Sequence, residues 1–318
     1  MNFMESLLLP DERWKIFYGI TSYQEFIDKF KLNLYLTPKA SEEIKGIFRV
    51  IQKILLFSYF DYEFVDVAAE RAKLKLETVL KIRYKEINGK VWSKNKNYKK
   101  LLSWFDEGGY FEWSSKEILD HVRQLRNITA HAEMHSYAGM MSLHHIQTFV
   151  SLINDTYESQ SLRKDRKSRT DQLNCSINKL LDRGCTLQVE DSAEILIHSM
   201  SLEFINNKNN PPIFHFYYRA TFSVPIEFKA SDPIPIVEWQ PLECNFIEET
   251  GDQMVGINAD GKNIFTLKLI QNPEIMVDWS SWKKHFDSYK STMILFDHAN
   301  SFDINEYCLS IREKFHKG

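Results

Sequence analysis

The chain has 318 residues, of which 43% are hydrophobic and 26% charged, which is the balance of a globular protein large enough for two domains. The formal net charge is -3, which excludes a general basic field for binding nucleic acid. Any contact with nucleic acid must therefore come from a local patch.

The first 40 residues predict strands or short helices packed on the body, because aromatic and charged residues alternate there without a clear period. From Ser41 the pattern becomes helical, and an alanine-rich helix follows that ends at the turn Asn88-Gly89. Apolar residues recur at three- and four-residue steps in both helices: Ile44, Ile47, Phe48, Ile51, Ile54 and Leu55, then Val65, Ala68, Ala69, Ala72, Leu76, Val79 and Leu80.

The rest of this half also predicts helices. A short one covers Tyr98 to Phe105, and the string S-S-K-E from Ser114 to Glu117 is a capping box that opens another. A last helix runs from about Met140 to Tyr157. Residues 41–158 therefore predict an all-α bundle of four or five helices.

A different composition follows the stretch Arg163 to Arg169, which has five basic residues and one acidic residue. We place a basic linker there that proteases should reach, with a short helix from about Asp171 to Asp182 after it. Segments rich in Ile, Val, Phe, Tyr and Thr then predict a mostly antiparallel sheet: Ala193–Ile205, Ile213–Phe222, Ile234–Trp239, Ile264–Ile270 and Ser291–Phe296. A helix from Asp303 to Phe315 ends the chain, so the prediction is an α+β protein with domains at 1–160 and 161–318.

Three residues on one predicted helix suit phosphodiester chemistry. In the string R-N-I-T-A-H, Arg126 can bind a phosphate with paired hydrogen bonds, His131 can move a proton near neutral pH, and Asn127 can orient either. At about 100° per residue, Asn127 and His131 lie on the face away from the predicted core, with Arg123, while Arg126 lies at its border. No metal is required, because RNA supplies its own 2′-hydroxyl nucleophile.

The segment L-R-N-I-T-A-H, residues 125–131, resembles the signature of the HEPN superfamily, and A-A-E-R-A-K-L-K-L-E, residues 68–77, is similar to a helix that often precedes it. The likeness covers about residues 41–158. It implies a catalytic pair of Arg126 and His131 with Asn127 between them. It also implies a homodimer that cleaves RNA without metal and leaves a 2′,3′-cyclic phosphate. Many members are toxins or effectors of antiviral defence, and others have lost catalysis and bind nucleotides or scaffold a complex.

Other patterns give weaker or negative predictions. Arg123, His135, Lys94, Lys96 and Lys99 are candidate RNA-binding residues, and Trp92 and Tyr98 lie among these lysines as possible stacking platforms. The basic stretch Arg163 to Arg169 is a second candidate RNA patch. In the string H-A-E-M-H, Glu133 is displaced by one position from the metalloprotease pattern, which disfavours zinc.

We therefore expect a cytoplasmic, metal-independent endoribonuclease that needs no cofactor, or else a silent HEPN protein that binds RNA or a nucleotide or acts as a scaffold. Four scattered cysteines and the absence of a long apolar segment fit a reducing compartment and no membrane partner. The expected partners are RNA, a second copy of the chain through the helical half, and a regulatory ligand or protein on the β-rich half. A third reading makes the chain a toxin whose β-rich half binds an antitoxin.

Overall fold

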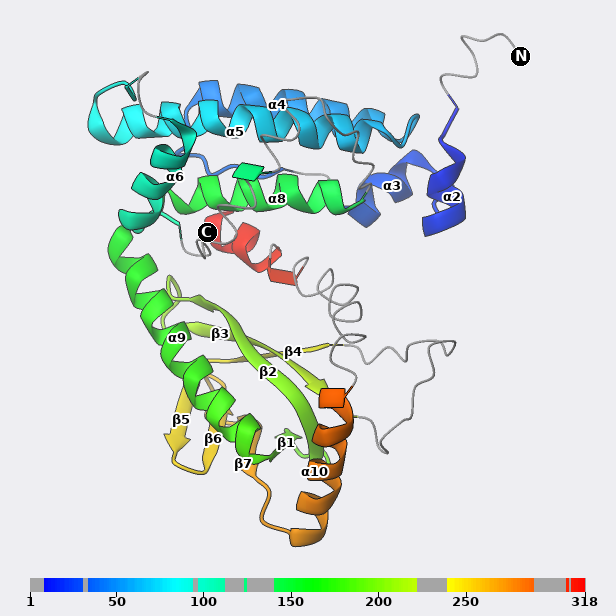
Figure 1. The fold of residues 1–318 in the computed structure, drawn as a ribbon, viewed down its shortest axis with the longest axis vertical. Coiled ribbons are helices and arrows are strands. Elements are labelled where there is room, and N and C mark those ends of the chain that lie inside the picture. Colours follow the sequence, from blue (N-terminus) through cyan, green and yellow to red (C-terminus); the bar gives the residue numbers. More distant parts are fainter. Residues whose placement is uncertain are drawn as a thin grey trace. The chain divides into compact units, whose positions relative to one another are not determined.

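The computed structural model describes residues 9–30, 34–93, 97–111, 123–124, 140–221, 239–288, 307–308 and 310–317. The chain divides into two compact units, one of residues 1–163 with Lys317 and the other of residues 164–316 (Figure 1). The described part of the first unit contains helices alone, and that of the second contains helices and an antiparallel sheet. The predicted α+β class is therefore confirmed.

Two short helices begin the described part of the chain, α2 (Glu12–Tyr18) and α3 (Tyr23–Phe30). Asp11 caps α2 by accepting a hydrogen bond from the backbone N–H of Arg13, and the paired Arg13 guanidinium lowers the pKa of Asp11 to about 2. The buried indole of Trp14 donates to the Ser58 carbonyl at 2.6 Å. This bond ties α2 to the C-terminal end of α4 (Glu42–Phe57), whose C-cap residue is Ser58.

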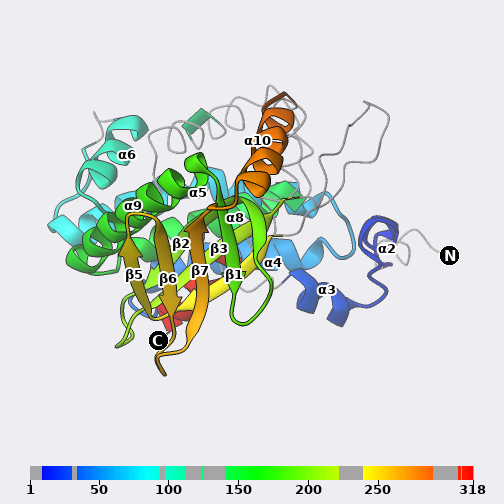
Figure 2. The same ribbon diagram turned by 90° about the horizontal axis from the view of Figure 1, so that it is seen from below.

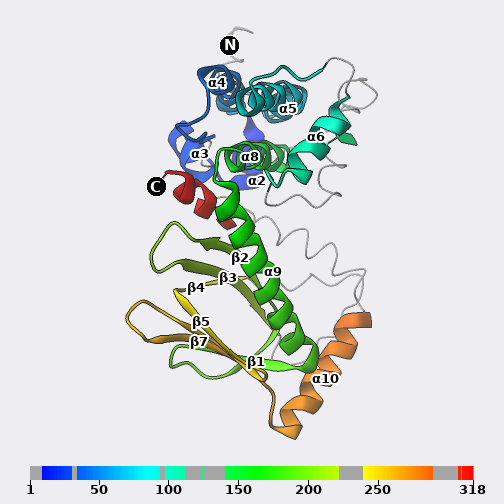
Figure 3. The ribbon, with the colours of Figure 1, turned by 90° about the vertical axis from the view of Figure 1, so that its left-hand side faces the viewer.

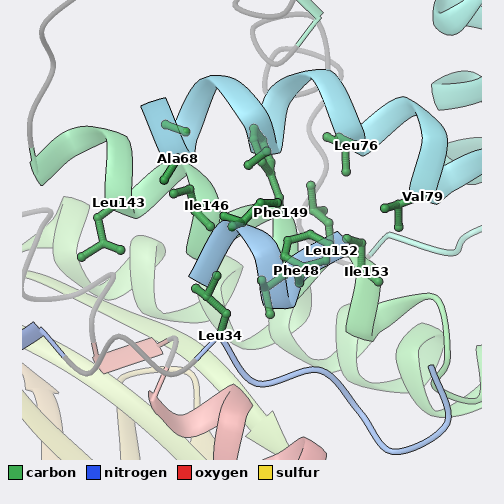
Figure 4. Close-up of a cluster of buried hydrophobic side chains, with 14 of the residues drawn as sticks. Leu34, Phe48, Ala68, Leu76, Val79, Leu143, Ile146, Phe149, Leu152 and Ile153 are labelled. Carbon is green, nitrogen blue, oxygen red and sulfur yellow. The ribbon is translucent and has the colours of Figure 1, made fainter. Parts of the chain in front are cut away.

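The core of the first unit lies between α4 (Glu42–Phe57), α5 (Phe64–Asn88) and α8 (Met140–Asp155). These helices run nearly parallel to one another, and Figure 3 views them almost end-on. The predicted stripe of α5 is buried in full, and its alanines let α4 and α8 approach closely (Figure 4). Gly89 ends α5 in the left-handed conformation with φ of 66°, as the predicted turn requires. A shorter helix, α6 (Tyr98–Glu107), buries its apolar face in the same core.

The second unit is built on a curled sheet. Its described strands are β1 (Cys185–Val189), β2 (Ile195–Asn206), β3 (Ile213–Ala220), β4 (Gln240–Cys244), β5 (Phe246–Thr250), β6 (Gln253–Ile257) and β7 (Asn263–Leu269). They pair antiparallel in the order β4-β3-β2-β1-β7-β6-β5 (Figure 2). The long β2 pairs with β1 at its start and with β3 along the rest, and β4 also contacts β6 and β7. The sheet therefore curls around its own core.

Helix α9 (Gln160–Arg183) extends along the sheet of the second unit (Figure 3). Its Leu173, Ile177 and Leu180 pack into that core. It is followed in the sequence by the sheet, then by α10 (Pro273–Ser288) and by a C-terminal helical segment that includes residues 310–317. Within the described residues, no helix combines the length and apolarity that crossing a bilayer needs. The predicted strand Ile234–Trp239, apart from Trp239 itself, the predicted strand Ser291–Phe296 and the capping box at Ser114 lie outside the described residues.

Candidate functional site

Most of the predicted site residues lie outside the described residues: Arg126, Asn127, His131, His135, Lys94 and Lys96. Two others are described. Arg123 is half-buried in a short helical piece, and Lys99 is exposed on α6. Helix α8 begins at Met140, nine residues after His131 in the sequence.

The proposed stacking role of Trp92 and Tyr98 is wrong. Both side chains are buried in the helical core, with 6% and 7% of their surface exposed. Trp92 packs edge-on against Tyr84, with ring centroids 4.8 Å apart. Because both side chains are buried, these aromatics belong to the helical core rather than present rings to RNA bases.

Helix α5 carries a group of polar residues that the sequence did not reveal. Asp66 accepts a hydrogen bond of 2.5 Å from the hydroxyl of Ser142 on α8, and Lys73 is only 4% exposed although it is a lysine. Burial lowers the pKa of Lys73, and the charges of Glu70 and Asp66 act in the opposite direction. Asp66, Glu70 and Lys73 follow one another at helical spacing, which places the lysine near its two carboxylates.

The buried Lys73 makes a prediction about stability and pH. Its folded pKa is lowered, so between the folded and the unfolded pKa the unfolded chain binds more protons at this residue, and the contribution of Lys73 to the free energy of unfolding should rise as pH increases through that range. The raised pKa values of the buried thiols Cys185, Cys244 and Cys308 act in the opposite direction, so the effect is measured as a difference between variants. Lys73→Met removes the charge and keeps most of the packing, so this increase of the unfolding free energy with pH should disappear. Urea unfolding at pH 7 and at pH 10 measures it. Lys85→Met, on the exposed side of the same helix, should keep the wild-type pH dependence of the unfolding free energy. The same pH dependence in Lys73→Met would contradict the account.

The basic stretch predicted as a linker is part of α9, and Arg163 is one reason. Its guanidinium donates to the carbonyl of Gly109 at 3.0 Å, to that of Glu158 at 2.6 Å and to that of Asp155. The last two carbonyls lie at and just beyond the end of α8, where helix carbonyls lack partners within the helix. Arg163 therefore closes the end of α8 instead of remaining in solvent.

Arg166 is buried even more completely, with 1% of its surface exposed. Its guanidinium lies over the rings of Phe204 and Phe315, at 4.7 Å and 4.6 Å from their centroids, and donates to the side-chain oxygen of Asn207 at 3.1 Å. Such stacking suits the flat, weakly hydrated guanidinium. With two of its arginines inside the protein, the stretch Arg163 to Arg169 is neither the predicted linker nor the predicted continuous RNA-binding patch.

Another polar group lies on the sheet. His215 and Glu243 are direct cross-strand partners on β3 and β4, with Nδ1 and Oε1 3.1 Å apart, and the hydroxyl of Tyr307 donates to the same oxygen at 3.0 Å. The hydrogen bond to His215 is the main reason why the pKa of Glu243 is lowered. This group attaches the C-terminal helical segment to the sheet, a role that the sequence alone did not reveal because the three residues lie far apart in the chain.

Within the described ranges, no three side chains of His, Cys, Asp or Glu gather as metal ligands would. The four cysteines are unpaired, with Cys175 exposed and the others buried. Comparisons with protein-family models, with curated proteins and with solved structures found no match.

Proposed function

We propose that the chain is a metal-independent endoribonuclease of the HEPN type whose first unit carries the active site. One observation carries the proposal: Arg126, Asn127 and His131 occur at the spacing of the family signature, in the part of the sequence that precedes α8. The helical character of the described residues of the first unit supports it. So does the long α5, in which the second segment of resemblance, residues 68–77, supplies much of the buried stripe.

The reaction follows from the chemistry of these residue types. His131 takes the proton of the RNA 2′-hydroxyl, the oxygen attacks the adjacent phosphorus, and the bond from phosphorus to the 5′-oxygen breaks. The leaving oxygen then receives a proton from water, and His131 releases to the solvent the proton that it took, so the products are a 2′,3′-cyclic phosphate and a 5′-hydroxyl end. Arg126 binds the non-bridging oxygens and stabilises the charge that develops on them, and Asn127 orients the arginine or the phosphate.

Incubation of the purified full-length chain with total RNA in excess EDTA tests this function. Cleavage should persist, because no step uses a metal, and the new ends should accept phosphate from polynucleotide kinase without prior phosphatase treatment. Loss of cleavage in EDTA, or fragments with 5′-phosphate ends, would contradict the mechanism. RNA retained on a filter with the protein but left intact would instead favour the silent, RNA-binding reading.

A further inference from the structure

An open groove runs between α9 and the edge strand β5 in the second unit. It consists of two hollows of about 480 and 350 Å³, and Glu249 contributes to the walls of both. Four polar residues of α9 lie along it at the spacing of one helix face: Arg169, Gln172, Ser176 and Lys179. From Arg169 to Lys179 the helix rises about 15 Å, which is the length of four to five residues of extended chain.

The wall formed by β5 carries unused backbone hydrogen-bonding groups. Thr250 and Gln253 pair across the two-residue turn Gly251-Asp252, so their backbones exchange hydrogen bonds. Hydrogen-bonded pairs alternate along an antiparallel ladder, so the backbone of Glu248 also bonds to β6. The N–H and C=O groups of Ile247 and Glu249 therefore point away from β6. Among the described residues, β5 pairs with β6 alone, so these groups form a free edge beside the groove.

Charges alternate along the same groove. The guanidinium of Arg169 lies 5.0 Å from the ring centroid of Phe214, and this contact holds the arginine in position. Within the described part of the chain, Arg169 has no carboxylate partner. Glu249, exposed on β5, follows it, and the exposed Lys179 lies at the end near Gly251. The order along the groove is therefore positive, negative, positive.

We propose that this groove binds one extended peptide segment as an added strand on β5, with acidic, basic and acidic side chains at alternate positions. Alternate residues of a strand share one face and lie about 7 Å apart, so three of them match the spacing of the groove charges. A second copy of β5 is a poor occupant. Antiparallel pairing of two such strands would bring Glu248 and Glu249 beside the same carboxylates of the partner.

The probe is the heptapeptide TEVKVET-amide with an uncharged fluorophore on its N-terminus, and its charges read the same in both chain directions. Its control is the charge-inverted TKVEVKT-amide with the same label. The full-length chain should bind the first peptide at least about tenfold more tightly, as measured by fluorescence anisotropy. Arg169→Gln should remove most of this preference, because the substitution deletes one of the two cations that face the acidic residues. Lys167→Gln, on an exposed position of α9 outside the groove, should leave it unchanged.

Hydrogen exchange followed residue by residue in the NMR spectrum tests the added strand itself. The amides of Ile247 and Glu249 should exchange more slowly with the first peptide bound, while that of Glu248, already bonded to β6, should change little. Equal binding of both peptides, or binding without this protection, would overturn the proposal. Protection that grows with protein concentration in the absence of peptide would assign the edge to a second copy and also overturn it.

Discussion

His131→Ala is expected to abolish RNA cleavage while leaving the thermal unfolding midpoint nearly unchanged. Proton transfer by a positioned side chain contributes about 10²- to 10⁴-fold to such reactions, and the predicted helix places His131 off its core stripe. Arg126→Ala should lower cleavage by about 10²-fold or more, because the phosphate loses its charged donor. Gel analysis of RNA fragments in EDTA measures the rates, and calorimetry measures the midpoints.

His316→Ala is the matched control, since this histidine belongs to the C-terminal helical segment of the second unit. It should retain wild-type cleavage. Undiminished cleavage by His131→Ala would show that another residue moves the proton. A large fall in the unfolding midpoint of His131→Ala would show that the residue is structural, and the loss of cleavage would then say nothing about catalysis.

Arg166→Ala should destabilise the second unit by about 3 kcal/mol, which is large for a charged residue. The substitution empties the space over the rings of Phe204 and Phe315, which the guanidinium contacts, and it removes the hydrogen bond from Arg166 to the Asn207 oxygen. Urea unfolding, combined with hydrogen exchange in α9 and β2, measures the effect. Lys167→Ala, the exposed neighbour, should change stability by less than about 0.5 kcal/mol.

Proteolysis is a second test of whether Arg163 and Arg166 are buried in α9. Since Arg163 and Arg166 are buried in α9, trypsin should leave the native chain intact at both positions. Arg166→Ala should admit cleavage within α9 at the exposed Lys164 and Lys167. Rapid cutting of the wild-type chain after Arg163 or Arg166 would show that the stretch is a linker after all and would contradict the packed helix.

The sequence predicted best where apolar residues alone mark the buried face. The stripe of α5 was predicted residue by residue, because small and aliphatic side chains recur at three- and four-residue steps. The burial of Lys73 was not predicted, because a lysine within an apolar stripe is ordinarily expected to be solvent-exposed. Here the carboxylates of Glu70 and Asp66 on the same helix partly offset the cost of burying its charge.

In α9, the charge of Arg166 prevented its burial from being predicted. Arg166 precedes Leu173, Ile177 and Leu180 at helical spacing, so it continues their stripe, but its positive charge made the segment look like a solvated linker. Stacking on two phenylalanines, which come from distant parts of the chain, is what makes its burial favourable. No local pattern contains that information.

Short and exposed elements were missed for a related reason. Strand β5 has the sequence F-I-E-E-T, and as an edge strand it lacks the clean alternation that predicts a half-buried strand. Helix α10 begins at Pro273, and Asn272 accepts a hydrogen bond from the N–H of Glu274 as a cap, but the residues that follow form no clear apolar stripe. The motif residues Arg126, Asn127 and His131 remain predictions from the sequence, because they lie outside the described residues.

The central claim is a ribonuclease site shared by two copies of the chain, and mixing two inactive variants tests it most directly. On the helix predicted from the sequence, Arg126 and His131 would be separated by about 140°, so a single copy would not aim both at one phosphate, whereas Arg126 of one copy and His131 of the other could meet across a two-fold axis. Arg126→Ala and His131→Ala, unfolded and refolded together, should recover about a quarter of the wild-type rate: half of the dimers are then mixed, and each mixed dimer has one complete site of two. Either variant refolded alone should stay inactive. A mixture that remains as inactive as its components, while light scattering reports dimers, would contradict the shared site.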